Sequence, residues 1–166
     1  EVPVFWKSLE ELAESPVYGI VIANELLDSL PVERIIFKDN QLHRQGISIE
    51  KIDASYSLRF IEMQLTNKIK DYLLNLDKSS GLKLPPSNSV DSWNTEIHID
   101  LEEYLGKISR ALLHGTVLII DYMLEASRYY NYSRDSGTIL AYKDQKALND
   151  FLQEPGFYDL TSHLCL

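Results

Sequence analysis

The sequence predicts an α/β fold, a doubly wound sheet of parallel strands connected through helices. Two stretches of apolar and β-branched residues, 17–23 and 116–122, are too short for helices and show no polar alternation. This pattern is typical of strands buried on both faces of a parallel sheet. Between these two stretches, apolar residues recur at the spacing of a helix. An acidic side chain lies near the end of each stretch: Glu25 at the first and Asp121 at the second. Parallel strands connected by helices favour this architecture.

Composition narrows the function classes. The 166 residues form one domain or a large piece of one, and 16 basic against 25 acidic residues give a net charge of −9. Without a basic stripe, nucleic acid is excluded as a main partner, whereas a basic partner fits. No apolar run is long enough to insert into a membrane. The single Cys165 excludes an internal disulfide and indicates a reducing compartment.

The first elements follow from capping and turn signals. Residues 8–11 have capping-box spacing and open a short helix that Pro16 closes. After the strand at 17–23, Asn24 is expected to cap a short helix over 25–30, with Glu25 and Asp28 on one helical face. Residues 34–50 predict a β-hairpin that turns at residues 39–40 and lies outside the parallel sheet.

The middle of the chain alternates helices, a loop and a short strand. A helix of about five turns is expected where apolar residues recur every three or four positions. Residues 78–94 are rich in Ser, Pro and Asn and predict a long surface loop, followed by an extended piece at 95–99. Residues 100–103 should cap a helix that ends at Gly115 in a left-handed conformation. The apolar positions of the five-turn helix are Leu58, Ile61, Leu65, Ile69, Tyr72 and Leu76.

The acidic residues suggest a ligand site, because ligands of open α/β sheets bind at the carboxyl ends of the strands. Acidic residues are also common in a first helical turn because of the helix dipole, so both interpretations of Glu25 and Asp28 stay open. Tyr122, Tyr129 and Tyr130 could wall a pocket or simply pack in the core. Glycine-rich phosphate loops, the Gly-x-Ser-x-Gly elbow and His-Glu-x-x-His do not occur, the histidines are scattered, and no metal site is predicted.

A joint pattern of motifs resembles a known family. The chain is similar, in motif order and spacing, to the MidA-like methyltransferases, which include the mitochondrial arginine methyltransferase needed for complex I assembly. The resemblance covers almost the whole chain. The residues that carry it are Ala23 to Asp28 with Pro31 and Val32, Glu96, Gly115, Leu118 to Tyr122, Tyr129, Tyr130, Arg134, Gly137, Thr138, Pro155, Gly156, Asp159 to Thr161 and His163.

The resemblance implies a methyltransferase that uses S-adenosylmethionine, built on a Rossmann-like sheet of seven strands. On this basis residues 1–166 are expected to be the C-terminal part of the methyltransferase domain, with residues 32–95 as an inserted hairpin, helix and loop. The glycine-rich cofactor loop and the ribose-binding acid are expected upstream of Val17 and outside this chain. The fragment alone is therefore expected to be inactive.

The resemblance also implies roles for particular residues. The acceptor is a protein with an exposed arginine, whose charged guanidinium pairs bidentately with carboxylates. Glu25, with Asp28 or Glu96 beside it, is expected to hold the guanidinium as the catalytic set. Asn24 and Glu25 are expected to bind the cofactor. The substrate pocket is expected to comprise Asp121, Tyr122, Tyr129, Tyr130, Arg134 and His163.

Departures from the family keep two alternatives open. Met123 stands where the family usually has glycine, and the sequence at 163–165 replaces His-Val-Asp. The chain could therefore belong to an inactive, methyltransferase-like assembly or scaffold protein, or to a methyltransferase acting on a small-molecule acceptor. The resemblance implies a location either in the bacterial cytoplasm or in the mitochondrial matrix. The sequence does not indicate the oligomeric state.

Overall fold

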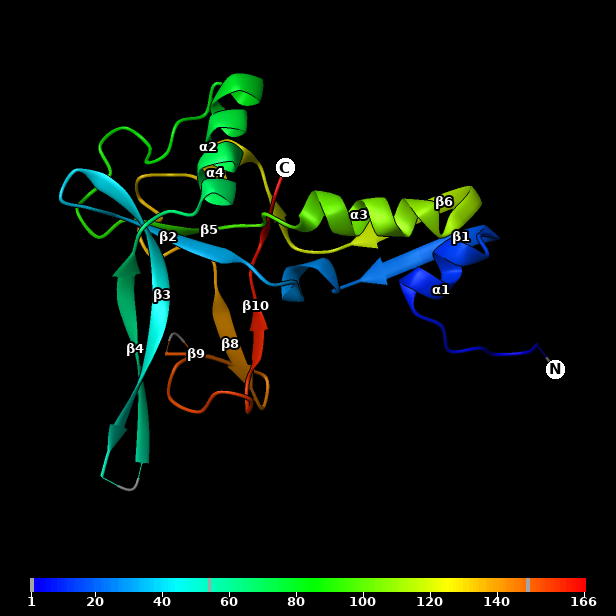
Figure 1. The fold of residues 1–166 in the computed structure, drawn as a ribbon, viewed down its shortest axis with the longest axis horizontal. Helices are drawn as coiled ribbons and strands as arrows, with labels where there is room; N and C mark the ends of the chain where they lie inside the picture. Colours follow the sequence, from blue (N-terminus) through cyan, green and yellow to red (C-terminus); the bar gives the residue numbers. More distant parts are fainter. Residues whose placement is uncertain (1, 54, 149) are drawn as a thin grey trace.

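A computed structural model describes residues 2–53, 55–148 and 150–166 of the chain, which form a mixed α/β fold. A parallel pair of strands, β1 (Val17–Asn24) and β6 (Leu112–Ile120), lies at one end with helices α1 (Leu9–Glu14) and α3 (Leu101–Arg110). A four-stranded antiparallel sheet and helix α2 (Asn67–Ser80) lie at the other end (Figure 1). The turn that follows β1 connects the parallel pair to the antiparallel sheet.

The parallel pair confirms the two predicted strands, in register from Tyr18 with His114 to Asn24 with Ile120. The expected helix end at Gly115 is wrong, because α3 ends at Arg110 and Gly115 lies inside β6 opposite Gly19. A Cβ atom at Gly115 would collide with the carbonyl oxygen of Gly19. Glycine is therefore needed here for close approach of two strands, not for a left-handed helix end.

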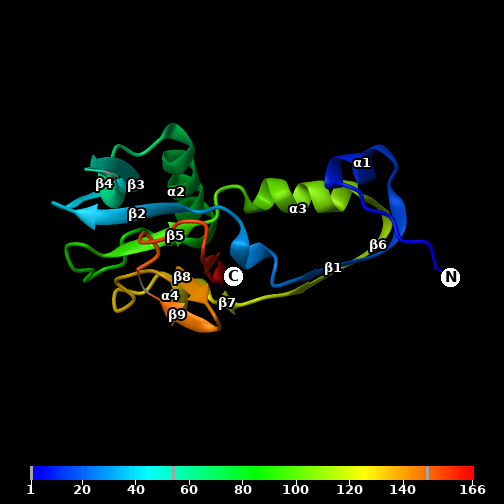
Figure 2. The same ribbon diagram turned by 90° about the horizontal axis from the view of Figure 1, so that it is seen from below.

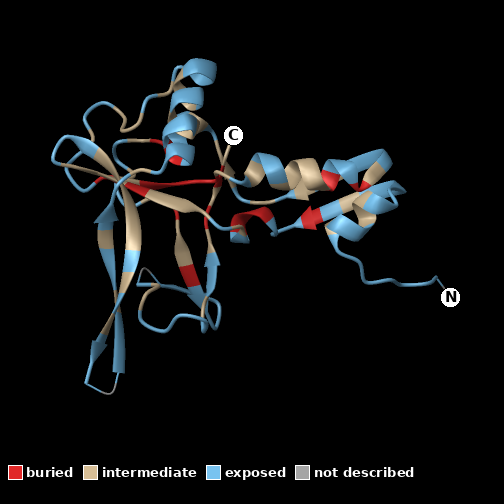
Figure 3. Cartoon of the chain, in the orientation of Figure 1, coloured by how far each residue is buried: buried red, intermediate tan, exposed pale blue. Residues whose placement is uncertain are grey.

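The expected burial of these strands on both faces is also wrong for the described chain. Ile20 is 70% exposed and Ile22 is 65% exposed. Figure 2 shows α1 and α3 on the same side of the pair, and Figure 3 shows β1 and β6 largely exposed. The apolar sequence of β1 is thus suited to a covered sheet, but the described residues supply no second layer for it.

The antiparallel sheet has the order β4 (Ser55–Met63), β3 (Gln41–Ile52), β2 (Glu33–Lys38) and β5 (Asn94–Ile97). The predicted hairpin is confirmed, and its turn residues Asp39 and Asn40 both have positive φ, as tight hairpin turns require. The extended piece expected at 95–99 is β5, which pairs antiparallel with β2. Beyond the sheet, β3 and β4 continue as a long projecting hairpin (Figure 1).

The expected helix of five turns forms only in its second half. Thr66 caps α2, which ends at Gly81 in a left-handed conformation, while Leu58 and Ile61 belong to β4. Tyr56, Leu58 and Phe60 alternate with polar residues, which is the period of a half-buried strand. Pairing with β3 along the whole of β4 therefore prevails over the helical spacing.

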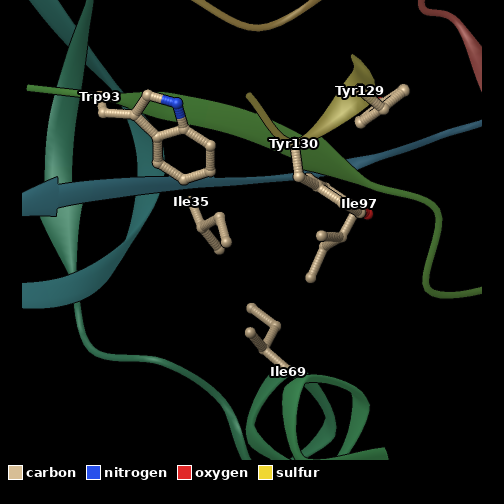
Figure 4. Close-up of a cluster of buried hydrophobic side chains, with 6 residues drawn as sticks. All are labelled: Ile35, Ile69, Trp93, Ile97, Tyr129 and Tyr130. Carbon is tan, nitrogen blue, oxygen red and sulfur yellow. The ribbon is translucent and has the colours of Figure 1, made fainter. Parts of the chain in front are cut away.

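The core lies where α2 packs against the antiparallel sheet (Figure 4). Trp93 is fully buried there, and its indole Nε1 donates a hydrogen bond to the carbonyl oxygen of Asn131 at 3.0 Å. This contact holds the end of the irregular segment 81–93, which agrees with the predicted loop. The buried core residues are Ile35, Ile69, Trp93, Ile97, Tyr129 and Tyr130.

The C-terminal third is built from short elements. β7 (Met123–Leu124) pairs in parallel with β11 (Leu164–Cys165), and α4 (Ala126–Tyr129) follows β7. β8 (Leu140–Lys143) pairs with both β9 (Lys146–Leu148) and β10 (Asp159–Thr161). Across the part of the chain that is described, no helix has the length and apolar character to cross a membrane.

Candidate functional site

The site is built around the turn that leaves β1. Asn24 is the last strand residue and Glu25 follows with φ of 44°, its backbone N–H donating to the carbonyl oxygen of Ile120 at 2.8 Å. The helical segment is a single 3₁₀ turn, η1 (Leu27–Ser29). The expected helix over 25–30, with Asn24 as its cap, is therefore wrong, because Glu25 has a positive φ and the helical turn begins only after Leu26. A left-handed Glu is strained, and such strain is concentrated at functional sites.

Asp121 positions this turn. Its Oδ2 accepts hydrogen bonds from the backbone N–H groups of Leu27 at 2.9 Å and Asp28 at 3.2 Å. Its Oδ1 accepts from the backbone N–H of Tyr122 at 2.8 Å. The residue that follows β6 thus anchors the turn after β1, because both carboxylate oxygens of Asp121 accept hydrogen bonds from backbone N–H groups.

Asp28 is the most unusual ionisable group of the turn. The residue is 4% exposed, and its Oδ1 has no hydrogen-bond partner among the residues described. Burial raises the pKa of Asp28, and the charges of Asp121, Glu25 and Asp159 raise it further. A buried carboxyl group whose hydrogen bonds are incomplete is costly, which makes Asp28 a candidate for binding a ligand.

Ser162, which no sequence motif singles out, holds Asp28 in place, and His98 in turn contacts Ser162. The backbone N–H of Ser162 donates to the carbonyl oxygen of Asp28 at 2.9 Å. The hydroxyl of Ser162 lies 3.1 Å from Nε2 of His98, which is 7% exposed and has its pKa lowered mainly by burial. His98 and Ser162 are 64 positions apart, and no local motif in the sequence predicts this contact.

Two cavities meet at Asp28. The acidic cavity has a volume of about 530 Å³ and includes Glu25, Asp28 and Asp159 in its lining. The apolar cavity has a volume of about 500 Å³ and lies between the β3–β4 hairpin and the segment 151–160. Asp28, Ser29, Thr161 and Ser162 line both cavities. The turn after β1 therefore borders two adjoining spaces of different chemistry.

Tyr122 and His163 lie together in the lining of the acidic cavity, with ring centroids 6.0 Å apart. The backbone N–H of His163 donates to Oγ1 of Thr138 at 3.1 Å. Burial and the charge of Arg134 lower the pKa of His163, which favours a neutral imidazole at this wall. The structure thus brings these two predicted pocket residues together with Glu25 and Asp28.

Glu96 is held in a separate network. It is fully buried, its Oε1 lies 3.1 Å from Nε of Arg34, and its Oε2 accepts from the backbone N–H of Thr138 at 2.7 Å. Neither cavity that meets at Asp28 has Glu96 in its lining among the described residues. The structure therefore does not place Glu96 beside Glu25, because the antiparallel pairing of β5 with β2 sets Glu96 opposite Arg34.

The remaining pocket residues are dispersed. Tyr129 and Tyr130 are buried in the core at 0% and 4% exposure, with an edge-to-face ring contact, so they do not wall the acidic cavity. Burial raises the pKa of both hydroxyl groups. Arg134 lines a different cavity of about 400 Å³, and its Nε donates to the carbonyl oxygen of Arg128 at 3.3 Å.

Comparisons with known proteins identify the family to which the chain belongs. The chain belongs to a methyltransferase family whose model, described as "Putative S-adenosyl-L-methionine-dependent methyltransferase", matches residues 1–166. This match confirms the resemblance to the MidA-like methyltransferases. No curated protein matches the chain.

Two crystal structures from Burkholderia thailandensis share the fold. One is a superfamily member bound to S-adenosyl-homocysteine, with 23% identity and a TM-score of 0.73 over 90% of this chain and 35% of that chain. The other is a native structure from the same superfamily, with 24% identity and a TM-score of 0.73 over 90% of this chain and 36% of that chain. The present chain therefore spans about a third of the length of these structures.

Proposed function

We propose that this protein is an S-adenosylmethionine-dependent methyltransferase that methylates an arginine side chain of a protein substrate. The family match supports the reaction class. The observation that carries the arginine acceptor is the buried carboxyl group of Asp28 at the junction of the two cavities, whose Oδ1 has no hydrogen-bond partner among the described residues. The MidA-like resemblance makes a subunit of respiratory complex I the first substrate to test.

The acidic cavity suits both a cofactor and a cationic acceptor. Glu25 is exposed and stands at the carboxyl end of β1, where ligands of α/β sheets bind. Together with the adjacent exposed Asn24, it would hold polar groups of the cofactor. When bound, S-adenosylmethionine supplies a methyl group on a positively charged sulfur. The Burkholderia structure with S-adenosyl-homocysteine supports this assignment, since its protein has the same fold.

The carboxylates of the cavity would orient the acceptor. A guanidinium is always protonated in water and presents a planar fork of N–H donors. Asp28 would accept from one edge of this fork, and the charges of Glu25 and Asp159 would favour the cation. Fixing the planar group leaves one nitrogen directed at the methyl carbon, and alignment of this kind is a large part of catalysis. One of these carboxylates would accept the proton that the nitrogen must lose.

We also propose that β1 and β6 are neighbouring strands of the seven-stranded sheet in the full protein. Their parallel pairing and the exposure of Ile20 and Ile22 support this arrangement. Additional strands and helices would cover the apolar side chains that the described residues leave open.

The test uses the full protein, methyl-labelled S-adenosylmethionine and a cell extract, with hydrolysis of the proteins to amino acids. We expect label in methylarginine. Asp28→Asn should lower kcat by at least about a hundredfold, because a neutral amide no longer holds the cation, while cofactor affinity measured by calorimetry stays within about twofold. Asp71→Asn, at an exposed position on α2, is the matched control and should change neither quantity.

Two results would contradict the proposal. Cofactor binding without any methylated amino acid would move the acceptor to a small molecule. Loss of cofactor affinity in Asp28→Asn as large as the loss of activity would place Asp28 in cofactor binding instead of acceptor orientation.

A further inference from the structure

We infer that the apolar cavity holds a bulky apolar side chain that neighbours the target arginine in the substrate protein. The inference rests on the proposed function and adds a second specificity element to it. Its occupant is an extended substrate segment that carries one cationic and one nearby apolar side chain.

One wall of the apolar cavity is a face of the β3–β4 hairpin. Ile47 pairs with Phe60 and Ile49 pairs with Leu58, so these side chains share one face of the two-stranded ribbon. Ile47, Leu58 and Phe60 line the cavity, yet Ile47 remains 51% exposed and Phe60 39% exposed. Apolar side chains left in contact with water around a concave space are typical of a binding site.

The opposite wall comes from the segment 151–160. Phe151, Leu152 and Leu160 line it, and the rings of Phe151 and Phe60 make an edge-to-face contact with centroids 5.6 Å apart. This contact connects the segment to the hairpin across the cavity. The two walls are far apart in sequence, so the cavity exists only in the folded protein.

The charged residues around the apolar cavity indicate what kind of ligand it binds. Both arginines in the lining already have acidic partners: Arg44 makes two hydrogen bonds to Glu33, at 2.6 and 3.1 Å, and Arg34 lies against Glu96. Asp28 is therefore the charged residue of this lining that has no ion pair among the described residues, and its Oδ1 also lacks a hydrogen-bond partner. A ligand that complements the cavity is cationic at the Asp28 end and apolar along the hairpin.

The connection between the two cavities sets the spacing. Asp28 borders both spaces, so a guanidinium bound there leaves the adjoining backbone at the entrance to the apolar cavity. An extended chain advances by about 3.3 Å per residue, so a side chain one to three positions from the arginine reaches the apolar walls. The β3–β4 hairpin, which lies outside the parallel sheet, thus determines specificity for the residues that flank the arginine.

The test compares two synthetic peptides with the full protein. Both have one central arginine, which is flanked on each side by leucine in the first peptide and by alanine in the second. We expect KM for the leucine peptide to be lower by about tenfold at similar kcat, the amount that burial of one leucine side chain provides. Ile47→Ala and Phe151→Ala should each remove most of this preference.

Matched controls lie on the same elements. Ile52 is 52% exposed and belongs to the other face of β3, and Phe157 is 73% exposed on the same segment as Phe151. Neither lines the apolar cavity. Ile52→Ala and Phe157→Ala should therefore keep the leucine preference. The two cavity variants change separate walls. If one of them fails to fold, the other still tests whether the cavity causes the leucine preference.

The outcomes separate this inference from the proposed function. Equal KM values for the two peptides, or equal effects of cavity and control variants, would overturn the apolar site even if methylarginine forms. If no methylarginine forms, fluorescence anisotropy of the same labelled peptides tests binding directly. A leucine preference that Ile47→Ala abolishes would then support the apolar site while the proposed reaction fails.

Discussion

We expect Asp28 to lower the free energy of unfolding of this protein, although the proposed reaction requires it. It is buried, its Oδ1 is unpartnered, and three other carboxylates raise its pKa. An unsatisfied buried polar group costs about 1–3 kcal/mol, and more when it is charged. Asp28→Asn removes the charge but leaves a polar amide, so we expect the free energy of unfolding to rise by about 1 kcal/mol while activity is lost.

The pH dependence of this gain has a defined sign. A carboxyl group with a raised pKa binds protons more tightly in the folded than in the unfolded state. Its destabilising effect is therefore absent below the ordinary carboxyl pKa, grows as pH rises and is complete above the raised pKa of Asp28. The advantage of Asp28→Asn should consequently be largest near about pH 8 and shrink as the pH is lowered towards about 4.

Urea unfolding followed by circular dichroism at several pH values measures this difference. Asp71→Asn on α2 is the control and should stay within about 0.5 kcal/mol of the wild type at every pH. An Asp28→Asn variant that is less stable than the control at high pH would contradict this expectation. Such a result would mean that the carboxylate of Asp28 is a satisfied structural group.

Three further changes test the framework of the site. Glu96→Gln should destabilise the protein by about 3 kcal/mol, because it leaves the guanidinium of Arg34 without its buried charge partner; a loss below about 1 kcal/mol in urea unfolding would contradict this. Gly115→Ala should lower the free energy of unfolding by about 1–3 kcal/mol more than Gly19→Ala, whose added Cβ meets nothing within 4 Å. Thermal unfolding of both variants measures this difference, and equal stabilities would contradict it. Asp121→Ala should cost about 1–3 kcal/mol, because three backbone N–H groups lose their acceptor, and it should increase amide exchange at Leu27 and Asp28, which carry two of these groups. Unchanged exchange there would show that another group holds the turn.

The sequence alone determined features that depend on neighbouring residues. The capping box at Ser8, the hairpin turn at Asp39 and the two parallel strands each follow from local propensity or from a short period. The family resemblance, which depends on several motifs in one order, was confirmed as well. The positions of Glu25 and Asp28 at the carboxyl end of β1 also followed from local order in the chain.

Only the tertiary structure decided which of these groups meet. Pairing of β3 with β4 turned a stretch with helical spacing into a strand, and pairing of β5 with β2 placed Glu96 against Arg34. The contact between His98 and Ser162 and the junction of the two cavities at Asp28 join segments more than 60 positions apart. Local propensity carries no information about such pairings, because their free energy comes from burial and hydrogen bonds that exist only once the distant segments have come together.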